Sequence, residues 1–170
     1  HKDLPQNASE MTEARLARLK NSTTGEYAQD VANNIRASMQ KHAAVFRTQE
    51  IMDKGVTSIL DIEEQVKHIH LRDKSQVFNT ALVEALEVDN LIEVAKATMI
   101  SAAARHECRG AHSVLDYERP ENDPEHPLGR NDKEWMKHTL WYKEGNRLAY
   151  KPVNMKPLTV DTVPPKPRTF

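Results

Sequence analysis

Apolar residues recur at intervals of three and four along the first 106 positions, a spacing typical of amphipathic helices. The only prolines and glycines in this stretch, the residues that most often interrupt helices, are Pro5, Gly25 and Gly55. The pattern predicts four helices, which we place at residues 9–20, 26–46, 48–71 and 80–106. The fourth presents an apolar stripe that consists of Leu82, Leu86, Leu91, Ile92, Ala95, Met99 and Ala103.

The second and third predicted helices carry stripes that run from Val31 to Phe46 and from Ile51 to Ile69. Long amphipathic helices with short connections pack as antiparallel neighbours, because each must bury its stripe against the others. Gly55 lies within the third helix, where a glycine costs about 1 kcal/mol relative to alanine, so we expect helices to approach closely there. The predicted fold is mainly α, an antiparallel bundle of three long helices plus a shorter one.

The rest of the chain is predicted to form turns and extended segments, since it holds eight of the nine prolines. Side chains alternate in character from Trp135 to Tyr142. Gly145 and Asn146 signal a turn, and a second extended run covers residues 148–153. This succession predicts a small β-hairpin. The Pro-rich C-terminal tail should be extended, cannot be a central strand, and normally needs another surface to order it.

Length and composition agree with a helical domain and a small appendage. A chain of 170 residues can bury a core of its own. The change in proline content divides it into a helical bundle at residues 1–110 and a small irregular C-terminal domain with the hairpin at 111–170. Hydrophobic residues make up 38% and charged residues 29%, as in soluble globular proteins. Because no apolar run approaches the roughly 18 residues of a membrane span, we expect none.

Charge and aromatic content argue against nucleic acid as a partner. The formal net charge is −1, the two signs are mixed along the chain, and aromatic residues make up only 5%. The five glycines are scattered, so neither a dinucleotide-binding fingerprint nor a Walker loop is present. Both loops need clustered glycines, because backbone amides must approach the phosphates. We therefore expect no cofactor to be bound in this chain by either route.

The segment from His106 to His112 holds the most reactive side chains. A zinc-protease motif would need a second histidine four residues after His106, where the chain has Gly110. His106, Cys108 and His112 could supply metal ligands in principle, but they straddle a predicted helix end. A nucleophilic Cys108 would lack an orienting third group. As the only cysteine it excludes an internal disulfide and fits a reducing compartment. We assign no metal ligand and no catalytic residue.

Arg105, Arg109 and His112 lie at the end of the fourth predicted helix and allow two interpretations. Cations at this position can cap the last helical carbonyls and interact favourably with the helix dipole, which explains their spacing without any function. Alternatively, the turn is an interface element that faces an acidic or carbonyl-rich surface. Arg109 would then be the principal contact, because a planar guanidinium can bind a carboxylate through two hydrogen bonds.

The same turn carries a resemblance to a known family. The segment from Glu107 to Ser113 (ECRGAHS), followed by Asp116 and Tyr117, resembles the Glu-Ser-Arg-Gly-Ala-His motif and downstream aspartate of succinate dehydrogenase and fumarate reductase flavoproteins. Further similar segments, in the family's order, are residues 45–47, 52–55, 78–80, 86–91, 152–155 and 163–170. The sequence departs from the pattern at Cys108, where serine is usual, at Val114, where arginine is common, and in a longer excursion at 118–130.

The resemblance implies a full-length protein with an N-terminal FAD domain and a capping domain. In this family the flavin is linked through a histidine and oxidises succinate by hydride transfer, and electrons pass to an iron–sulfur subunit and on to quinone. Those catalytic and FAD-binding residues lie in parts that this chain lacks, and the start at His1 suggests a piece of a longer polypeptide. The complex would sit at the cytoplasmic face of the bacterial inner membrane.

The chain itself would then buttress the FAD domain and would be inactive alone. The residues expected at that interface are Arg105, Glu107, Arg109, His112 and Asp116. Alternatives within the resemblance are the same region of fumarate reductase or of L-aspartate oxidase. Alternatives of another class are a free-standing helical adaptor, which would leave no large apolar patch uncovered, and an autonomous metal-dependent hydrolase.

Overall fold

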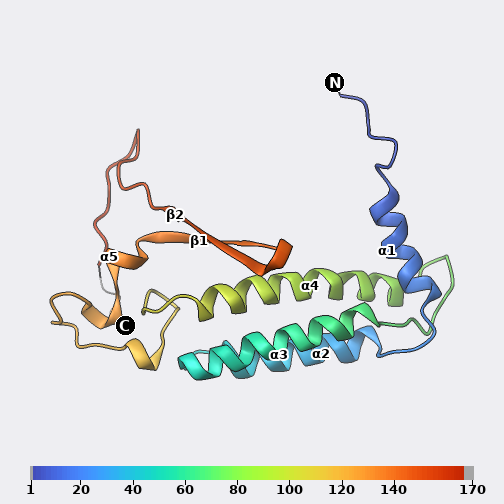
Figure 1. Cartoon of the computed structure of the whole chain (residues 1–170), viewed down its shortest axis with the longest axis horizontal. Coiled ribbons are helices and arrows are strands. Elements are labelled where there is room, and N and C mark those ends of the chain that lie inside the picture. The colour runs from blue at the N-terminus through green and yellow to red at the C-terminus, as the bar shows by residue number, and fades with distance from the viewer. Residues whose placement is uncertain (1, 167–170) are drawn as a thin grey trace.

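The computed structural model describes residues 2–166 and confirms a mainly α fold with a small hairpin. The four predicted helices are present, and Figure 1 shows their arrangement. The helices and strands are α1 (Glu10–Asn21), α2 (Ala28–His42), α3 (Gln49–Lys67), α4 (Thr80–Ala103), α5 (Asp132–Trp135), β1 (Lys137–Tyr142) and β2 (Arg147–Pro152). Short 3-10 turns lie at Leu115–Tyr117, Pro127–Gly129 and Glu144–Asn146.

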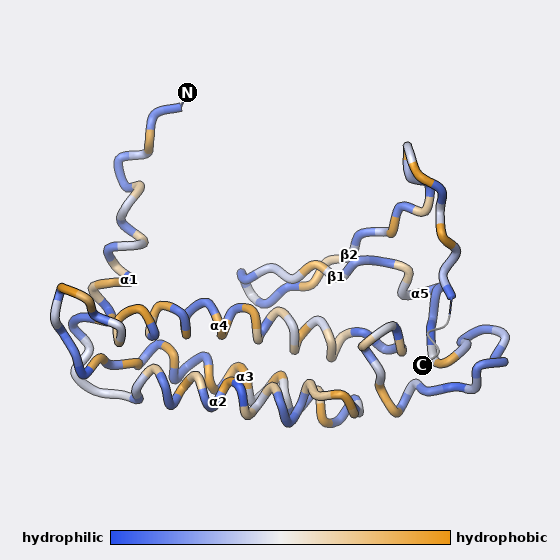
Figure 2. Tube along the Cα trace, turned by 180° about the vertical axis from the view of Figure 1, so that it is seen from behind, coloured by the Kyte–Doolittle hydropathy of each residue, from blue (hydrophilic) through white to orange (hydrophobic). Residues whose placement is uncertain are grey.

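Helices α2, α3 and α4 lie side by side, each antiparallel to the next in the chain, and form the bundle (Figure 1). Hydrophobic positions recur along all three, whereas the loop before α5 is mostly hydrophilic (Figure 2). The fully buried side chains at their contacts include Val31, Ile35, Met52, Ile59, Ile92 and Met99. Burying one such side chain stabilises the fold by about 1.5–3 kcal/mol, so the bundle core is the main source of stability.

Gly55 lies where α2 and α4 both approach α3, as its position in the sequence predicted. A Cβ atom at this residue would lie 2.6 Å from His42 Cβ and 2.6 Å from Met99 Sδ. Real Cβ atoms do not approach other atoms so closely, because van der Waals repulsion rises steeply below contact distance. The absence of a side chain therefore permits the close packing of the three helices.

Two helices end earlier than the apolar stripes indicated. Helix α2 ends at His42 rather than Phe46, and the side chain of Phe46 is 78% exposed. The chain turns there because the Arg47 guanidinium caps the end of α2, donating to the carbonyls of Ala43 (2.9 Å) and Ala44 (2.7 Å). Helix α3 ends at Lys67 rather than Leu71, although Ile69 and Leu71 are buried beyond its end. For α3, these buried residues beyond the helix end made the apolar stripe longer than the helix itself.

The short helix α1 projects from one end of the bundle (Figure 1). It is attached by Leu19, which is fully buried, and by two arginines. Arg15 and Arg18 both bind the Asp89 carboxylate of α4, at 2.7 and 2.8 Å. Arg18 also donates to the carbonyl of Val66 (3.0 Å), the last buried residue of α3. The shorter helix of the predicted fold, α1, therefore contacts the end of the bundle instead of lying along it.

The hairpin pairs β1 with β2 antiparallel, from Lys137 opposite Pro152 to Tyr142 opposite Arg147. Alternate residues of β1 are half-buried and exposed, as predicted. The prediction was wrong for Trp135, which ends α5 and is buried instead of starting the strand. Asn131 caps this short helix by accepting a hydrogen bond from the Glu134 amide (3.1 Å), and the extended chain begins only beyond it.

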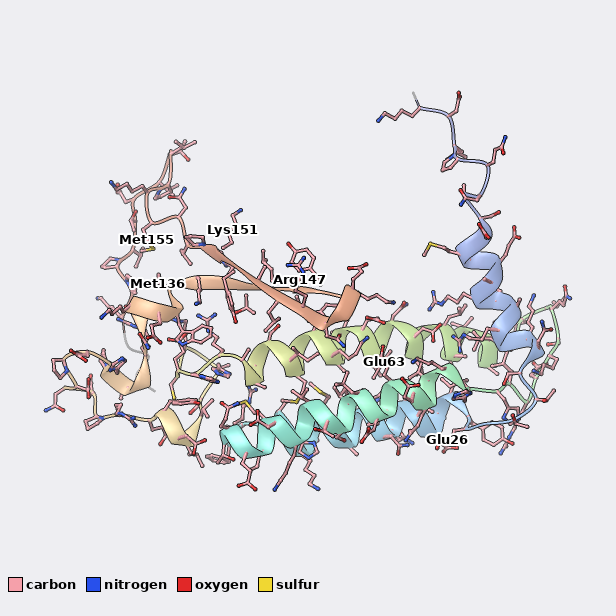
Figure 3. The ribbon with its side chains drawn as sticks, viewed as in Figure 1. Glu26, Glu63, Met136, Arg147, Lys151 and Met155 are labelled. Atoms are coloured by element: carbon pink, nitrogen blue, oxygen red, sulfur yellow. The ribbon has the colours of Figure 1, made fainter. Side chains whose placement is uncertain are left out.

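A buried lysine of the bundle contacts the hairpin. Lys96 of α4 is 2% exposed, and its Nζ lies 2.5 Å from Glu63 Oε1 of α3 and 5.6 Å from the ring centre of Trp141 in β1. Glu63 projects from α3 on the side of α4 (Figure 3). Lys143, in the hairpin connection, binds Glu93 of α4 at 2.9 Å. These charge-assisted contacts join three elements that are distant in sequence.

After the hairpin, residues 153–166 are largely exposed and contain no helix or strand, and Pro167 lies outside the described residues. The prediction of an extended tail was wrong for residues 155–162, where the chain bends and the Thr162 hydroxyl donates to the Met155 carbonyl (2.7 Å). Within residues 2–166, none of the helices combines the length and the apolar character needed to cross a membrane.

Candidate functional site

The segment after α4 reverses direction in a tight turn. The Arg109 amide donates to the His112 carbonyl (2.7 Å), and the His112 amide donates back to the Arg109 carbonyl (3.0 Å). Gly110 occupies the turn with φ of +57°, a left-handed backbone conformation that residues with a Cβ atom rarely adopt. This reversal directs Arg105, Glu107 and Arg109 toward one another.

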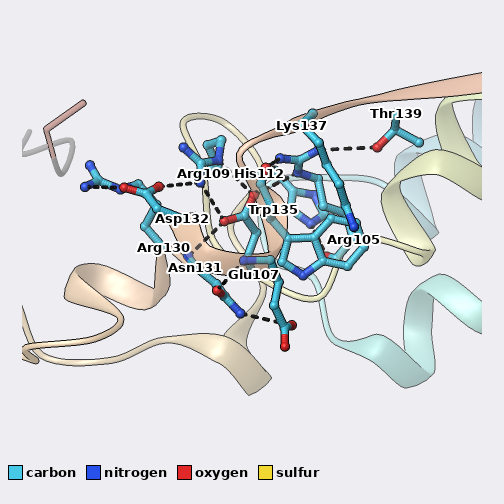
Figure 4. Close-up of polar contacts among 11 residues, drawn as sticks. Arg105, Glu107, Arg109, His112, Arg130, Asn131, Asp132, Trp135, Lys137 and Thr139 are labelled. Carbon is cyan, nitrogen blue, oxygen red and sulfur yellow. Dashed lines mark hydrogen bonds and ion pairs between the residues drawn. The ribbon is translucent and has the colours of Figure 1, made fainter. Parts of the chain in front are cut away.

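Glu107 is the centre of the site, and its side chain is 0% exposed. Its Oε1 accepts hydrogen bonds from Arg105 Nε (2.9 Å) and Arg109 Nε (2.8 Å). Its Oε2 accepts from Arg109 Nη2 (3.0 Å) and from the Asn131 backbone amide (2.9 Å). Figure 4 shows these contacts. A buried carboxylate is very costly unless it is neutralised and hydrogen-bonded, and here two guanidinium groups and an amide meet that requirement.

Arg105 connects this carboxylate to the hairpin. Its Nη2 donates to the Trp135 carbonyl (2.5 Å), and its Nη1 donates to the Lys137 carbonyl (3.0 Å) and to Thr139 Oγ1 (3.3 Å). All three guanidinium nitrogens are therefore used within the chain. The guanidinium also lies 5.3 Å from the ring centre of Trp135. Arg105 thus fixes the start of β1 relative to the end of α4.

Arg109 is held by two acids. Besides its two bonds to Glu107, its Nη2 donates to Asp132 Oδ1 (2.7 Å), and the other carboxylate oxygen of Asp132 pairs with Arg130 Nη2 (3.0 Å). Burial alone would lower the pKa of Arg109, but the hydrogen bonds and charges of Glu107 and Asp132 outweigh burial and raise it. Arg109 therefore stays cationic in this environment.

His112 connects the turn to the segment between α2 and α3. Its Nε2 lies 2.8 Å from the Arg105 carbonyl and its Nδ1 lies 3.2 Å from Arg47 Nη1. A carbonyl can only accept and a guanidinium can only donate, so Nε2 carries the hydrogen and Nδ1 accepts in a neutral ring. Burial, and then the charges of Arg47 and Arg105, lower the pKa of His112. Its role in this geometry is that of a neutral hydrogen-bonding bridge.

Asp116 lies in a separate cluster around Gln49. Its carboxylate accepts a hydrogen bond from the Gln49 backbone amide (2.6 Å) at the first residue of α3, where helix amides lack intrahelical partners. The Gln49 side chain donates to the Ala103 carbonyl at the end of α4 (2.8 Å) and accepts from the Tyr117 hydroxyl (3.0 Å). Asp116 therefore supports the α3–α4 contact.

The structure thus brings four of the five predicted interface residues, Arg105, Glu107, Arg109 and His112, into one hydrogen-bonded network and places Asp116 in another. The hydrogen bonds of these residues do not match the capping hypothesis. The side chain that donates to the final helical carbonyl, of Ala103, belongs to Gln49. The arginines instead reach forward in sequence, toward the hairpin and α5.

Sequence reasoning missed Asn131, Asp132, Arg130 and Gln49 as members of these clusters. A local signal existed for one of them: Asn131 followed three residues later by Glu134 has the pattern of a helix N-cap. The cap fixes the Asn131 amide, which is the group that Glu107 binds. No local signal pairs Gln49 with Ala103, because 54 residues separate them.

Cys108 and the histidines are not arranged as a metal centre. Within residues 2–166, no group of three or more His, Cys, Asp or Glu side chains is placed to hold a metal ion. Cys108 is buried, and its Sγ lies 3.4 Å from both the amide and the carbonyl of Val114. Burial raises the pKa of its thiol, and the charges of Glu118 and Glu107 act in the same direction. A protonated, enclosed thiol is a poor nucleophile.

The family described as fumarate reductase flavoprotein C-term matches residues 32–170. The succinate dehydrogenase flavoprotein subunit of Rickettsia bellii is 41% identical over 100% of this chain, which covers 28% of that relative. The fumarate reductase flavoprotein subunit of Escherichia coli is 32% identical over 93% of this chain, which covers 25% of that relative. The chain therefore spans about a quarter of the length of these curated relatives.

The fold is also similar to a solved structure. A chain of Escherichia coli quinol fumarate reductase superimposes with a TM-score of 0.75 and 28% identity, over 96% of this chain and 27% of that one. The similarity covers both the bundle and the hairpin region.

Proposed function

The chain belongs to the fumarate reductase flavoprotein C-term family, and we propose on this premise that it is the C-terminal structural part of a succinate dehydrogenase flavoprotein subunit. The matching succinate dehydrogenase subunit of Rickettsia bellii, at higher identity than the fumarate reductase subunit, supports the dehydrogenase direction. Such a subunit oxidises succinate to fumarate with FAD and passes electrons to an iron–sulfur subunit. The complex lies at the cytoplasmic face of the bacterial inner membrane.

The residues of this chain do not fit a flavin site of their own. A flavin pyrophosphate needs several backbone amides in one glycine-rich loop. The glycines with positive φ, at residues 25, 110, 129 and 145, lie in four separate turns. We therefore assign FAD, and the hydride transfer that it supplies, to the preceding part of the subunit, and no reaction step to this chain.

The role proposed for this chain is to hold the FAD and capping domains in position. The single observation that supports it is the Glu107 network, in which a fully buried carboxylate joins the end of α4 to α5 and the hairpin. Such a network makes the bundle and the C-terminal segment move as one body. Rigid support matters because hydride transfer tolerates little misplacement of the reacting atoms.

We propose that the turn at residues 105–112, with Asp116 beside it, forms the contact with the FAD domain. Arg105, Glu107 and His112 would shape this surface, since their hydrogen bonds lie within the chain. Arg109 would reach the partner, because its Nη1 makes no hydrogen bond to residues 2–166. Residues 1–110 and 111–170 would act as the two units of this support.

Mutation of the intact subunit tests the proposal. Arg109→Ala should lower the flavin content of the purified subunit and the yield of assembled complex. The matched control is Arg36→Ala, because Arg36 is an exposed arginine of α2 whose side chain, among residues 2–166, makes a hydrogen bond only to Asn33. Wild-type flavin content and assembly in Arg109→Ala would show that the turn does not support the FAD domain.

A further inference from the structure

A cavity of about 400 Å³ lies between the turn after α4 and the start of the hairpin. Its walls include Arg109 from the turn, Trp135 from α5, Lys137 and His138 from β1, and Val153 beyond β2. Within the described part of the chain, no acidic residue lines this cavity. The cavity therefore differs from the rest of the surface, where both signs of charge are mixed.

The network behind the cavity has an excess of positive charge. Three guanidinium groups, those of Arg105, Arg109 and Arg130, pair with only two carboxylates, those of Glu107 and Asp132. The His112 ring is neutral by its hydrogen bonds, so it adds no charge. Within the ion pairs, the guanidinium groups thus outnumber the carboxylates by one, and the exposed Glu134 carboxylate joins the network only through the Asn131 side chain (3.2 Å).

Two residues that line the cavity each carry a donor with no hydrogen-bond acceptor among residues 2–166. One is Arg109 Nη1, on a guanidinium that three hydrogen bonds to Glu107 and Asp132 hold in place. The other is Lys137 Nζ, which lies 4.4 Å from the ring centre of Trp135 and 4.2 Å from that of Tyr150. Cation–π contact orients the ammonium without using its hydrogen-bond donors. Both cationic groups are therefore held in place by contacts within the chain, Arg109 beside Glu107 and Asp132 and Lys137 beside Trp135 (Figure 4).

We infer that this cavity receives an aspartate or glutamate side chain from the part of the flavoprotein subunit that precedes this chain. The inference rests on the proposed function and names the chemistry of the contact. A carboxylate is the protein group that accepts charge-assisted hydrogen bonds from an ammonium or from a guanidinium. The chain covers 28% of the length of its Rickettsia bellii relative, so most of such a subunit lies outside it.

The exposure of the cavity favours a carboxylate carried by protein over a free small anion. Arg109, Lys137 and Val153 are only half-buried here. A small anion would remain largely hydrated between them, and its attraction would be screened by water and salt. A protein segment that brings the carboxylate also covers Val153 and the aromatic rings, excludes water, and so strengthens the ion pair.

Zero-length cross-linking of the intact subunit tests this contact. A carbodiimide joins a lysine amine to a carboxylate that it touches, and mass spectrometry identifies the pair. We expect Lys137 to be joined to an Asp or Glu that precedes this chain. The internal positive control is Lys143 with Glu93, which are 2.9 Å apart. Lys137→Arg should keep the charge but abolish the product, because guanidinium does not react.

A charge swap gives the second measurement. Lys137→Glu should raise the rate of limited proteolysis of the C-terminal part roughly tenfold, since the open population rises tenfold for each 1.4 kcal/mol lost. Reversal of the cross-linked acid to lysine should restore the wild-type rate. Formation of the Lys143–Glu93 product without any Lys137 product to the preceding part would overturn the inference.

The two proposals fail in different ways. If Lys137 forms no such product but Arg109→Ala still lowers flavin content, the support function stands and the carboxylate contact is wrong. If the product forms but Arg109→Ala leaves flavin content and assembly at wild-type levels, the contact stands and the support function is wrong.

Discussion

The backbone amide of Asn131 donates to Glu107 Oε2 at 2.9 Å, although 24 residues separate the two in sequence. This bond holds the end of the proline-rich segment 118–130 against the end of α4, and it places α5 beside the turn. It also adds an amide donor to a carboxylate whose side chain is 0% exposed. Stability of the C-terminal region should therefore depend on Glu107 more than on any surface charge.

Removal of the Glu107 charge should destabilise the chain. Glu107→Gln keeps the shape of the side chain but leaves the partly buried Arg105 guanidinium without its counter-charge and Arg109 with Asp132 alone, at a cost of about 2–3 kcal/mol. Urea denaturation followed by circular dichroism measures the change. Glu50→Gln is the matched control, since the Glu50–Lys54 pair is exposed, and it should leave the midpoint unchanged. Equal midpoints for the two variants would contradict the role of the network.

A methyl group at Gly55 should not be tolerated. Alanine is the better helix former by about 1 kcal/mol, but its Cβ would meet His42 and Met99 at 2.6 Å. Overpacking of this kind costs about 1–3 kcal/mol beyond the propensity gain, so Gly55→Ala should lower the melting temperature. Thr57→Ala, at an exposed position of the same helix, should leave it unchanged or raise it. A more stable Gly55→Ala variant would show that the three helices do not pack so closely.

The contributions of Lys96 and Glu63 to the free energy of unfolding should be coupled. Lys96→Met removes a buried ammonium, and the loss should be about 1–2 kcal/mol, because Glu63 and Glu93 remain a quarter exposed and can be rehydrated. Glu63→Gln should cost less in the Lys96→Met background than in the wild type, since its partner is already absent. A double-mutant cycle by urea denaturation measures this coupling, and strict additivity would contradict the ion pair.

Acid should weaken the fold partly through His112. Its folded pKa lies below the ordinary value of 6.5, because burial and then the neighbouring arginines disfavour the charged ring. The unfolded chain therefore binds more protons than the folded one once the pH falls below about 6.5, and stability decreases from there down to the folded pKa. The slope of unfolding free energy against pH should be smaller in His112→Gln over this window. An unchanged slope in His112→Gln would contradict this role of His112.

Cys108 should be unreactive in the folded chain. Its thiol is buried and its pKa is raised, so little thiolate is present at neutral pH. Iodoacetamide should modify it slowly under native conditions and rapidly in urea, with mass spectrometry as the measurement. Because it is the only cysteine, the mass change reports this site alone. Rapid native alkylation would mean that the Cys108–Val114 contact opens readily.

Sequence and structure agree best where the determining contacts are local. The helix of α4 follows from its apolar spacing and from Asn79, whose side chain accepts from the Leu82 amide (2.8 Å). The hairpin follows from alternation around Gly145. The errors occur where a distant residue changes a local outcome. Val45 and Phe46 continue the stripe of α2, yet the helix stops before them under the cap that Arg47 provides.

The sequence by itself determined the helices, the hairpin and the family motif, because periodicity and turn chemistry act between residues a few positions apart. It also marked Arg105, Glu107, Arg109 and His112 as a group. Only the tertiary structure decided what this group does. Its partners near α5 and in β1 follow the segment 118–130, and no local sequence pattern specifies the path of that segment. Folding also decided the directions in which the pKa values of Arg109 and His112 shift, because the cost of a charge depends on the surrounding dielectric and on partners brought together by folding.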